Sequence, residues 1–496
     1  MNLATIIDPH PADAVALVSR GRPTTYGQLR DEVARLRGGL AALGIGRGDR
    51  VALLFANKRY FVDTVLAVLG LGAIAVPLNP TNPGPAIEHE LNDVGAKAVL
   101  LGPSAAVAWS HVDRARIPTV EHVISANGDV PTATHHLDDL LAAEPVPVVD
   151  VEPGDLAVLL FTSGTAGAPR AAMLSHGNLL ANIDQAMAMP DRIGPDDIVF
   201  GLLPLYHIFG LNVVLFLTLA AGASVVLVMR FDPSTTLDTI LERGVTIVPG
   251  VPSMWQAIAQ VSGAQPGAFA NVRHALTGAA KMPEDTMHQL RERFGITLRE
   301  GYGLTEASPV VTTSVGVEPK VGSVGQPVHG VVVRVVDNDG DDVEQGDAGE
   351  IWVRGPNVFL GYWNDPVATN RALHADGWLR TGDVGVLDDD GYLWLVDRAK
   401  DLIIVSGFNV YPAEVEEVLL EYPGVDEVAV VGVPHPFTGE AVKAYVVMAP
   451  GREADEEQLI AFAHDHLARY KCPTKVLFVD ELPKGMGGKI LRRILR

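Results

Sequence analysis

Short apolar runs alternate with helical patterns over the first half of the chain. Runs rich in Val, Ile, Leu and Ala occupy 50–55, 98–101 and 225–228, whereas apolar residues at helical spacing occupy 26–37 and 60–69. This alternation is typical of a layered α/β fold with a mainly parallel sheet, because helices then cover both faces of the sheet. The pattern therefore predicts an α/β fold for this region.

The pattern changes after residue 320. Strand-like runs at 331–336 and 349–354 are separated by turns rich in Asp and Gly, which predicts a β-rich subdomain. Further on, a helix with Pro412 near its start precedes strands at 427–433 and 442–448. We expect a domain boundary near Lys400.

The stretch 208–229 carries no charge and is long enough to cross a membrane. Small and polar residues interrupt it, and its second half reads as a helix end, a turn and a strand. We therefore favour a buried helix and strand over a membrane span, and leave weak association with a membrane surface as an alternative. The first ten residues do not have the pattern of a signal peptide.

Charge and cysteine content narrow the function classes. The 496 residues include 38 basic and 60 acidic side chains, and the resulting net charge of −22 argues against binding to nucleic acids. The single cysteine, Cys472, excludes an intrachain disulfide and a cysteine-rich metal site, which fits a cytoplasmic protein.

A loop rich in small and hydroxylated residues follows the apolar run 156–161. Its backbone N–H groups and hydroxyls are suited to phosphate oxygens, with a cation at its end. It lacks the Lys-Ser/Thr pair of the Walker loop, and by itself it indicates either a phosphate site or a surface turn. Its residues are Thr162, Ser163, Gly164, Thr165, Ala166, Gly167, Ala168, Pro169 and Arg170.

Six motifs in a fixed order make the loop more specific. Together they resemble the adenylate-forming superfamily, which includes acyl-CoA synthetases, peptide-synthetase adenylation domains and beetle luciferases. The resemblance extends from Thr24 to Arg496, and the run 397–416 is most similar to fatty-acid–CoA ligases. The motifs are FTSGTAGAPR (161–170), LPLYHIFG (203–210), GYGLTE (301–306), GWLRTGD (377–383), DRAKD (397–401) and PKGMGGK (483–489).

The resemblance implies a reaction and a domain organisation. The acid reacts with ATP to give an acyl-adenylate and pyrophosphate, and a thiol then displaces AMP. The implied fold is α/β, with a large N-terminal AMP-binding domain (1–397) made of layered α/β subdomains and a β-rich subdomain. A small, mobile α+β domain (398–496) follows it, with a hinge at Lys400.

The resemblance also implies residues for the nucleotide. The loop 162–167 is expected to bind the β- and γ-phosphates, although Ala166 replaces the usual Thr and Arg170 the usual Lys, which changes the donor geometry. Tyr302 is expected to stack on adenine and Asp383 to accept from both ribose hydroxyls. The full implied set for ATP and CoA is Thr162, Ser163, Gly164, Thr165, Gly167, Arg170, Gly278, Ala279, Ala280, Gly301, Tyr302, Gly303, Asp383, Arg398 and, at the thioester stage, Gly407.

Four residues carry the implied chemistry. Thr305 donates to the α-phosphate, and Glu306 ligates Mg²⁺, a hard cation that prefers carboxylate and phosphate oxygens. Lys489 stabilises the charge that builds up between the carboxylate and the α-phosphate. His207 lies beside the acyl carboxylate and the thiol channel.

The substrate and acceptor are less narrowly defined. Residues after His207 are apolar and include no charged group to hold an amino acid, so a medium- or long-chain fatty acid fits best and a hydroxycinnamate-type aromatic acid second. The expected acceptor is CoA. The alternatives are an acyl-AMP ligase that loads a carrier protein, and a catalytically silent nucleotide- or lipid-binding homologue.

The end of the chain has a local charge opposite to the whole. Residues 469–496 hold eight basic and two acidic side chains. We expect this basic segment to meet the phosphates of ATP and CoA.

Overall fold

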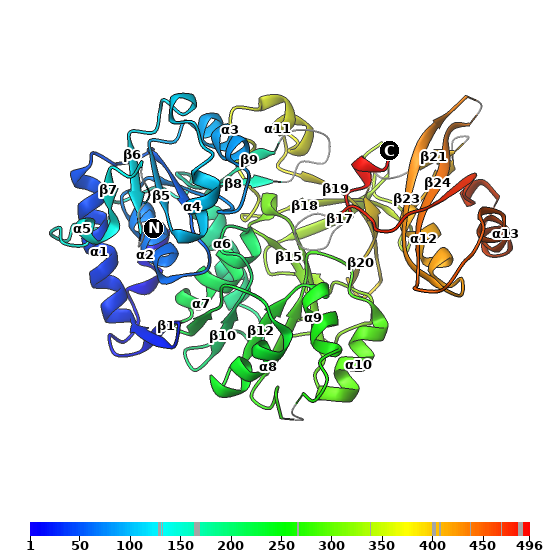
Figure 1. Cartoon of the computed structure of the whole chain (residues 1–496), viewed down its shortest axis with the longest axis horizontal. Coiled ribbons are helices and arrows are strands. Elements are labelled where there is room, and N and C mark those ends of the chain that lie inside the picture. Colours follow the sequence, from blue (N-terminus) through cyan, green and yellow to red (C-terminus); the bar gives the residue numbers. More distant parts are fainter. Residues whose placement is uncertain are drawn as a thin grey trace. The chain divides into compact units, whose positions relative to one another are not determined.

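The computed structural model describes residues 1–126, 130, 132–162, 169–264, 267–337, 339–398, 403–405, 408–436, 438–467, 469–484 and 490–496. The chain divides into two compact units (Figure 1). The first comprises Met1–Val332 and Val353–Leu379, and the second Val333–Trp352 and Arg380–Arg496. The second unit thus includes strands that lie before residue 398. The expected boundary at 397/398 remains a prediction, and the expected hinge, Lys400, lies outside the described residues.

A seven-stranded sheet forms one layer of the first unit. The strand order is β7-β6-β5-β3-β4-β8-β9, and all neighbours are parallel except β8 and β9. The predicted runs at 50–55 and 98–101 lie in its centre. Its strands are β3 (Arg50–Leu54), β4 (Ile74–Pro77), β5 (Ala98–Leu101), β6 (His122–Ser125), β7 (His135–His136), β8 (Leu156–Thr162) and β9 (Arg170–Ser175).

A nine-stranded sheet forms the second layer of this unit. Its order is β16-β15-β14-β13-β12-β10-β11-β1-β2, and the strands from β14 to β1 are parallel. The strands are β1 (Val15–Ser19), β2 (Arg22–Thr25), β10 (Ile198–Gly201), β11 (Ser224–Leu227), β12 (Ile247–Gly250), β13 (His274–Thr277), β14 (Leu298–Gly303), β15 (Val310–Thr313) and β16 (Gln326–Pro327).

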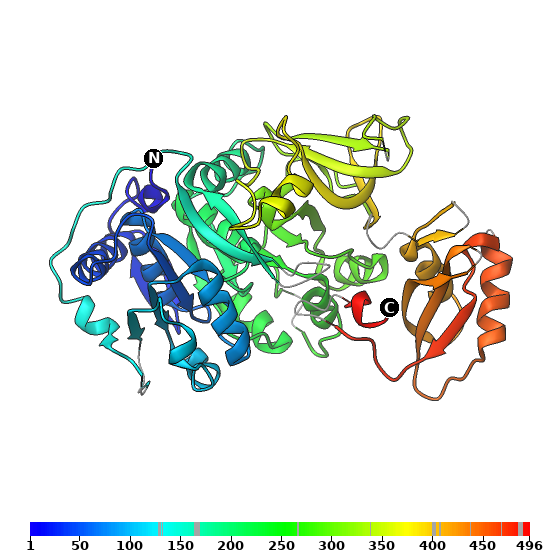
Figure 2. The same cartoon turned by 90° about the horizontal axis from the view of Figure 1, so that it is seen from above.

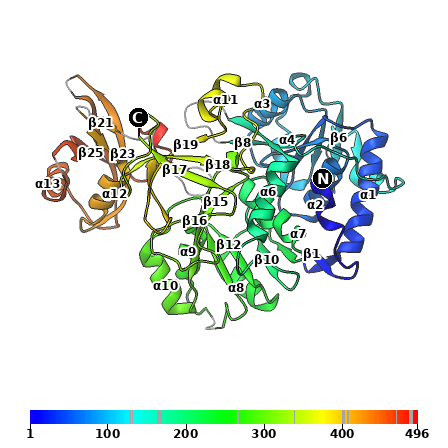
Figure 3. The same cartoon turned by 180° about the vertical axis from the view of Figure 1, so that it is seen from behind.

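Helices connect these strands, as the alternating pattern predicted. Helix α1 begins where the sequence indicated, because Thr25 and Gln28 form a reciprocal capping box, and it extends to Ala42. Helices α8, α9 and α10 lie beside one another next to the nine-stranded sheet (Figure 3). The helices of this unit are α1 (Tyr26–Ala42), α2 (Arg59–Gly70), α3 (Gly84–Val94), α4 (Ala106–Trp109), α5 (Leu137–Leu140), α6 (His176–Met187), α7 (Leu217–Ala220), α8 (Pro233–Glu242), α9 (Pro252–Ala259), α10 (Glu284–Phe294) and α11 (Pro366–Ala372).

The uncharged stretch 208–229 forms a helix, a turn and a strand. A π-helix, η4 (Phe209–Phe216), continues into α7 and is followed by β11. Among the described residues, no helix is both long enough and apolar enough to cross a membrane. The interpretation as a buried helix and strand is confirmed.

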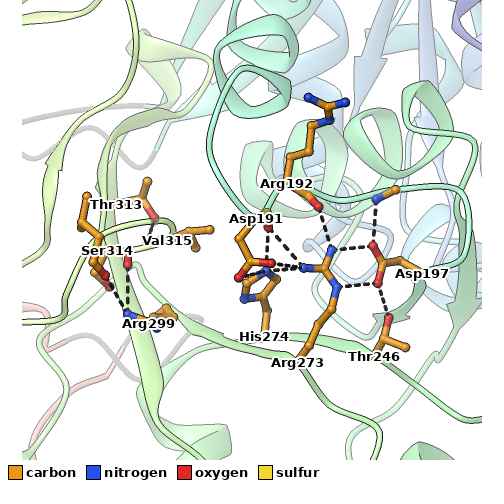
Figure 4. Close-up of polar contacts among 12 residues, drawn as sticks. Asp191, Arg192, Asp197, Thr246, Arg273, His274, Arg299, Thr313, Ser314 and Val315 are labelled. Atoms are coloured by element: carbon orange, nitrogen blue, oxygen red, sulfur yellow. Dashed lines mark hydrogen bonds and ion pairs between the residues drawn. The ribbon is translucent and has the colours of Figure 1, made fainter.

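Charged side chains join the amino ends of the parallel strands of the nine-stranded sheet. Arg273, which precedes β13, donates to Asp197, which precedes β10, at 2.8 and 2.6 Å, and to Asp191 at 3.0 Å (Figure 4). Thr246, which precedes β12, donates to Asp197 at 2.8 Å. Hydrogen bonds from Arg273 help to hold the pKa of Asp197 below its usual value, against the effect of burial. This amino edge is therefore rigidly connected.

The described residues of the second unit form a four-stranded sheet, two α-helices and a five-stranded C-terminal sheet, which is antiparallel except that its last strand pairs in parallel with its neighbour. The predicted strands at 331–336, 349–354, 427–433 and 442–448 are all present. Helices α12 and α13, golden orange and orange-red in Figure 2, pack on the C-terminal sheet through Val415, Leu419, Leu459 and Ala463. The elements are β17 (Val332–Val336), β18 (Gly349–Arg354), β19 (Leu379–Leu387), β20 (Leu393–Arg398), β21 (Ile403–Val405), β22 (Phe408–Val410), β23 (Val425–His435), β24 (Gly439–Met448), β25 (Lys475–Phe478), α12 (Pro412–Leu420) and α13 (Glu456–His466).

Candidate active site

Two of the six motifs and the segment 278–280, which the resemblance implies for the nucleotide, emerge from the same edge of the nine-stranded sheet. The segment 203–210 follows β10, the segment 278–280 follows β13, and the segment 301–306 begins in β14. These strands are parallel, so their carboxyl ends meet at one edge, where ligands of open α/β sheets bind. The fold therefore brings these three segments to the edge opposite the Arg273 network.

The three segments meet at Gly278. A Cβ atom added to Gly278 would lie 3.3 Å from the carbonyl oxygen of Gly301 and 3.5 Å from Cε1 of Phe209. Gly303 is needed for a close approach, because a Cβ there would lie 2.2 Å from the carbonyl oxygen of Pro309. The segment 278–280 is therefore next to both the motif 301–306, which contains Tyr302, and the segment that follows His207.

The neighbouring residues differ in how far they are exposed. Ala279, Ala280 and Gly303 are exposed at this edge, Gly301 is half-buried, and Tyr302 is 7% exposed. The stacking of Tyr302 on adenine stays a prediction.

The His207 side chain is exposed to solvent in the loop that follows β10. Desolvation by the surrounding protein lowers its pKa from the usual value, which favours the neutral imidazole. Its Nδ1 accepts a 3.3 Å hydrogen bond from the backbone N–H of Phe209. A neutral imidazole is suited to orienting a carboxylate or a thiol.

The loop that carries His207 is fixed by Asn57, a residue that the sequence did not indicate. The Asn57 side-chain amide donates to the carbonyls of Gly201, Leu202 and Leu203 at 3.1, 3.1 and 2.8 Å, and its oxygen accepts from the Leu205 N–H at 3.1 Å. Asn57 follows β3 of the other sheet, so it connects the carboxyl edges of both sheets. Its partners are more than 140 residues away in sequence, which hides them from local patterns.

Thr305 and Glu306 begin a 3₁₀ turn directly after β14. Both side chains are half-buried. The Tyr362 hydroxyl donates to Oε1 of Glu306 at 2.7 Å, and the Phe359 N–H donates to the Glu306 carbonyl oxygen at 2.9 Å. Burial and the nearby Glu306 carboxylate both raise the pKa of Tyr362, so it remains a donor. Tyr362 is a second residue that sequence reasoning missed.

Arg170 lies at the end of the predicted phosphate loop. Its Nε is 2.9 Å from Oδ2 of Asp365, and its guanidinium carbon is 5.9 Å from the ring centroid of Tyr362. The Thr162 hydroxyl donates to the Arg170 carbonyl at 3.3 Å, which closes the base of the loop. Ser163, Gly164, Thr165 and Gly167 lie outside the described residues, and their roles stay predictions.

Asp383 and Arg398 belong to the second unit. They are directly opposite each other in the antiparallel pair β19–β20. The Asp383 N–H donates to the Thr381 hydroxyl at 3.1 Å, and the Gly382 N–H donates to Oε1 of Glu350 at 3.2 Å. The ribose role stays a prediction for both residues. Gly407 and Lys489 lie outside the described residues.

The described side chains fit an Mg²⁺ ion that the phosphates of ATP also bind, rather than one held by protein side chains alone. Among them, no group of three or more His, Cys, Asp or Glu is arranged to hold a metal ion. Mg²⁺ commonly binds through one or two carboxylates together with substrate phosphates. Glu306, with one oxygen bonded to Tyr362, fits that pattern.

Comparison with known proteins decides the family. A family model described as AMP-binding enzyme matches residues 5–363, and one described as AMP-binding enzyme C-terminal domain matches 414–489. The chain belongs to the AMP-binding enzyme family. It is an enzyme of the adenylate-forming superfamily, an acid–thiol ligase, and the expected family is confirmed.

Relatives match over nearly the whole chain. The chain is 40% identical to a feruloyl-CoA synthase from Amycolatopsis sp, covering 99% of this chain and 96% of the relative. It is 36% identical to a long-chain-fatty-acid–CoA ligase from Salmonella typhimurium, covering 98% and 92%.

Solved structures confirm the predicted fold of a large N-terminal and a small C-terminal domain. ATP-bound MatB from Rhodopseudomonas palustris gives a TM-score of 0.91 at 34% identity, covering 100% of this chain and 98% of that chain. The fatty acyl CoA synthetase of Mycobacterium tuberculosis gives 0.81 at 32%, covering 100% and 97%.

Proposed function

We propose that this enzyme activates a medium- or long-chain fatty acid with ATP to acyl-AMP and pyrophosphate, then transfers the acyl group to CoA with release of AMP. We also place the domain boundary at 397/398 and the hinge at Lys400. The observation that carries the substrate proposal is an apolar, half-exposed helix face beside the nucleotide motifs.

This face belongs to η4 and the start of α7. Phe209, Val213 and Leu217 are half-buried, whereas the other residues of η4 are buried. The spacing of four residues places these three side chains on one side of the helix. Gly278 is beside the Phe209 ring, and no ionisable side chain occurs from 208 to 229. Such a wall favours an apolar acyl group next to the site of adenylation.

The chemistry requires a carboxylate to become a good electrophile. A carboxylate resists attack because an oxide would have to leave, and attachment to AMP removes that obstacle. In-line attack on the α-phosphorus requires positioning and stabilisation of charge rather than covalent catalysis by the protein.

Each residue then has a defined task. Thr305 donates to the α-phosphate, and Arg170 and the loop 162–167 hold the β- and γ-phosphates as pyrophosphate leaves. Neutral His207 orients the carboxylate without trapping it as an ion pair. Lys489 stabilises the charge at the α-phosphate. When bound to ATP, Mg²⁺ offsets phosphate charge, and Glu306 is the residue that would hold it.

A second candidate substrate is a hydroxycinnamate-type acid. It is favoured by the 40% identity with a feruloyl-CoA synthase. An aromatic ring is as compatible with the Phe209 face as an alkyl chain.

One assay separates the alternatives. ATP–pyrophosphate exchange is measured with octanoate, palmitate, 4-coumarate and ferulate, and thioester formation is measured after CoA is added. The highest kcat/KM with octanoate or palmitate supports the proposal, and the highest with 4-coumarate or ferulate supports the second candidate. Exchange without CoA-thioester product supports transfer to a carrier protein, and no exchange with any acid supports a silent homologue.

The role of Lys489 has its own test. Lys489→Ala should abolish pyrophosphate exchange and largely spare thioester formation from supplied acyl-adenylate, because the lysine acts only while charge builds up in the first step. Equal loss of both half-reactions contradicts this role.

A further inference from the structure

The segment 360–365 is held rigidly against β9. Met173 of β9 donates to the Gly361 carbonyl and accepts from the Leu360 N–H, both at 2.9 Å. The segment thus runs beside the strand that begins at Arg170, although it lies almost 200 residues later in the sequence.

Tyr362 in this segment reaches Glu306. Its hydroxyl donates to Oε1 at 2.7 Å, and its ring packs edge-on against Phe359 with centroids 5.0 Å apart. Phe359 in turn donates its N–H to the Glu306 carbonyl. Glu306 is therefore held at both its backbone and its side chain. In the part of the chain that the structure describes, no hydrogen bond reaches its other oxygen, Oε2.

The same segment also holds Arg170. Asp365 forms the 2.9 Å ion pair with Arg170, whose guanidinium carbon lies 5.9 Å from the Tyr362 ring centroid. One short, rigid segment thus fixes the predicted metal ligand and the predicted phosphate cation together.

We propose that Tyr362 is a positioning residue for the adenylation step, because its hydroxyl holds Oε1 of Glu306 and leaves Oε2 for Mg²⁺ on bound ATP. The inference rests on the proposed role of Glu306. Partners that orient a metal-binding carboxylate commonly change metal affinity by tenfold or more when they are removed.

The test removes only the hydroxyl, with Tyr362→Phe. Binding of the β,γ-methylene analogue of ATP is measured by calorimetry in excess EDTA and in saturating Mg²⁺. We expect the wild type to bind more tightly with Mg²⁺, and the variant to lose about tenfold of this gain while its metal-free affinity stays the same. The Mg²⁺ concentration for half-maximal pyrophosphate exchange should rise about tenfold, with kcat at saturating Mg²⁺ nearly unchanged.

A matched control is Tyr26→Phe. The Tyr26 hydroxyl is also buried, but it donates to the carbonyls of Leu219 and Ala223, at 3.2 and 2.8 Å, and not to Glu306. This variant should leave the effect of Mg²⁺ on binding unchanged. In a Glu306→Gln background, Tyr362→Phe should cause no further change in the affinity that Mg²⁺ adds to binding of the ATP analogue.

Two outcomes overturn the inference in different ways. If the wild type gains affinity from Mg²⁺ and Tyr362→Phe gains equally, Tyr362 does not position the metal ligand, and the proposed function is unaffected. If Glu306→Gln keeps the wild-type gain, the proposed role of Glu306 fails, and the role of Tyr362 fails with it.

Discussion

Asn57 shows how one side chain can fix the loop that carries His207. Its amide satisfies the carbonyls at the end of β10 and the N–H of Leu205, and the side chain is 5% exposed. An asparagine is suited to this position because it offers two donors and an acceptor in a compact group. Its task is to fix the backbone two residues before His207.

Asn57→Asp tests this role with almost no change in volume. A carboxylate cannot donate to the three carbonyls and would be buried among them, so we expect the free energy of unfolding to fall by about 3 kcal/mol. The KM for the acid should also rise, because His207 loses its fixed position. Urea unfolding followed by tryptophan fluorescence and steady-state kinetics measure the two effects.

Asn92→Asp is the control for Asn57. The amide of Asn92 also donates to a backbone carbonyl, that of Arg116, but on the surface. Its replacement should cost less than about 1 kcal/mol and leave the KM unchanged. If both variants lose the same free energy of unfolding, the special role of Asn57 is contradicted.

At the scale of elements, the sequence predicted most of what local patterns encode. The helix that begins at Tyr26, the α12 helix at Pro412 and the strands at 50–55 and 442–448 all occur where expected. The helix period and the alternation of strands depend on neighbours a few residues apart, so they are visible in one chain.

Contacts between distant residues were not predictable in this way. Tyr362 and Asp365 come 56 and 195 residues after their partners Glu306 and Arg170. A tyrosine hydroxyl gives no local signal of its acceptor, and the pairing exists only because segment 360–365 lies against β9. The motifs predict which groups act on substrate, whereas the side chains that hold those groups become visible only in the fold.

The amino edge of the nine-stranded sheet provides a test at this scale. Arg273→Ala removes the partner of Asp197, which is 7% exposed, and leaves that carboxylate buried without its counter-charge. We expect the free energy of unfolding to fall by about 3 kcal/mol. The KM values for ATP and for the acid should not change, because the motifs emerge from the opposite edge.

The exposed pair of Arg35 and Asp31 is the control for the amino edge. Arg35→Ala removes an i,i+4 pair on α1 and should cost less than about 0.5 kcal/mol in urea unfolding. A KM change in Arg273→Ala would contradict the separation between a structural edge and a reactive edge.

At the scale of the whole molecule, the basic C-terminal segment is less free than its sequence implied. Lys471, Lys484 and Arg492 pair with Glu414, Glu427 and Glu416 at 2.5, 2.7 and 2.7 Å. Arg492 thereby ties the end of the chain to α12. Among the described residues, these three basic side chains are compensated within the second unit, so part of the local charge excess serves folding.

Although the chain carries a net negative charge, some carboxyl groups in the first unit ionise only at a higher pH than usual. Burial raises the pKa of Asp63 to about 8, and burial likewise raises the pKa of Glu90 and of Glu300 to about 7. Such groups bind protons more readily in the folded state, so their contribution to stability falls as pH rises from the unfolded pKa to the folded one. Burial of His176 lowers its pKa to about 4, and its contribution is lost as pH falls from 6.5 toward 4. Stability should therefore decline on both sides of a mildly acidic optimum.

Glu300→Gln isolates one of these carboxyl groups. Glu300 is 8% exposed and immediately precedes the motif 301–306. Glutamine has the same shape as glutamate but carries no charge. The pKa rises from 4.5 to about 7, so we expect the variant to be more stable than the wild type by up to about 3 kcal/mol at pH 8. The difference should shrink toward zero at pH 4.5, where the wild-type carboxyl is protonated in the folded state. Urea unfolding at both pH values measures it, with the exposed Glu242→Gln as a control that shows no such dependence. A difference independent of pH would show that ionisation of Glu300 does not oppose folding.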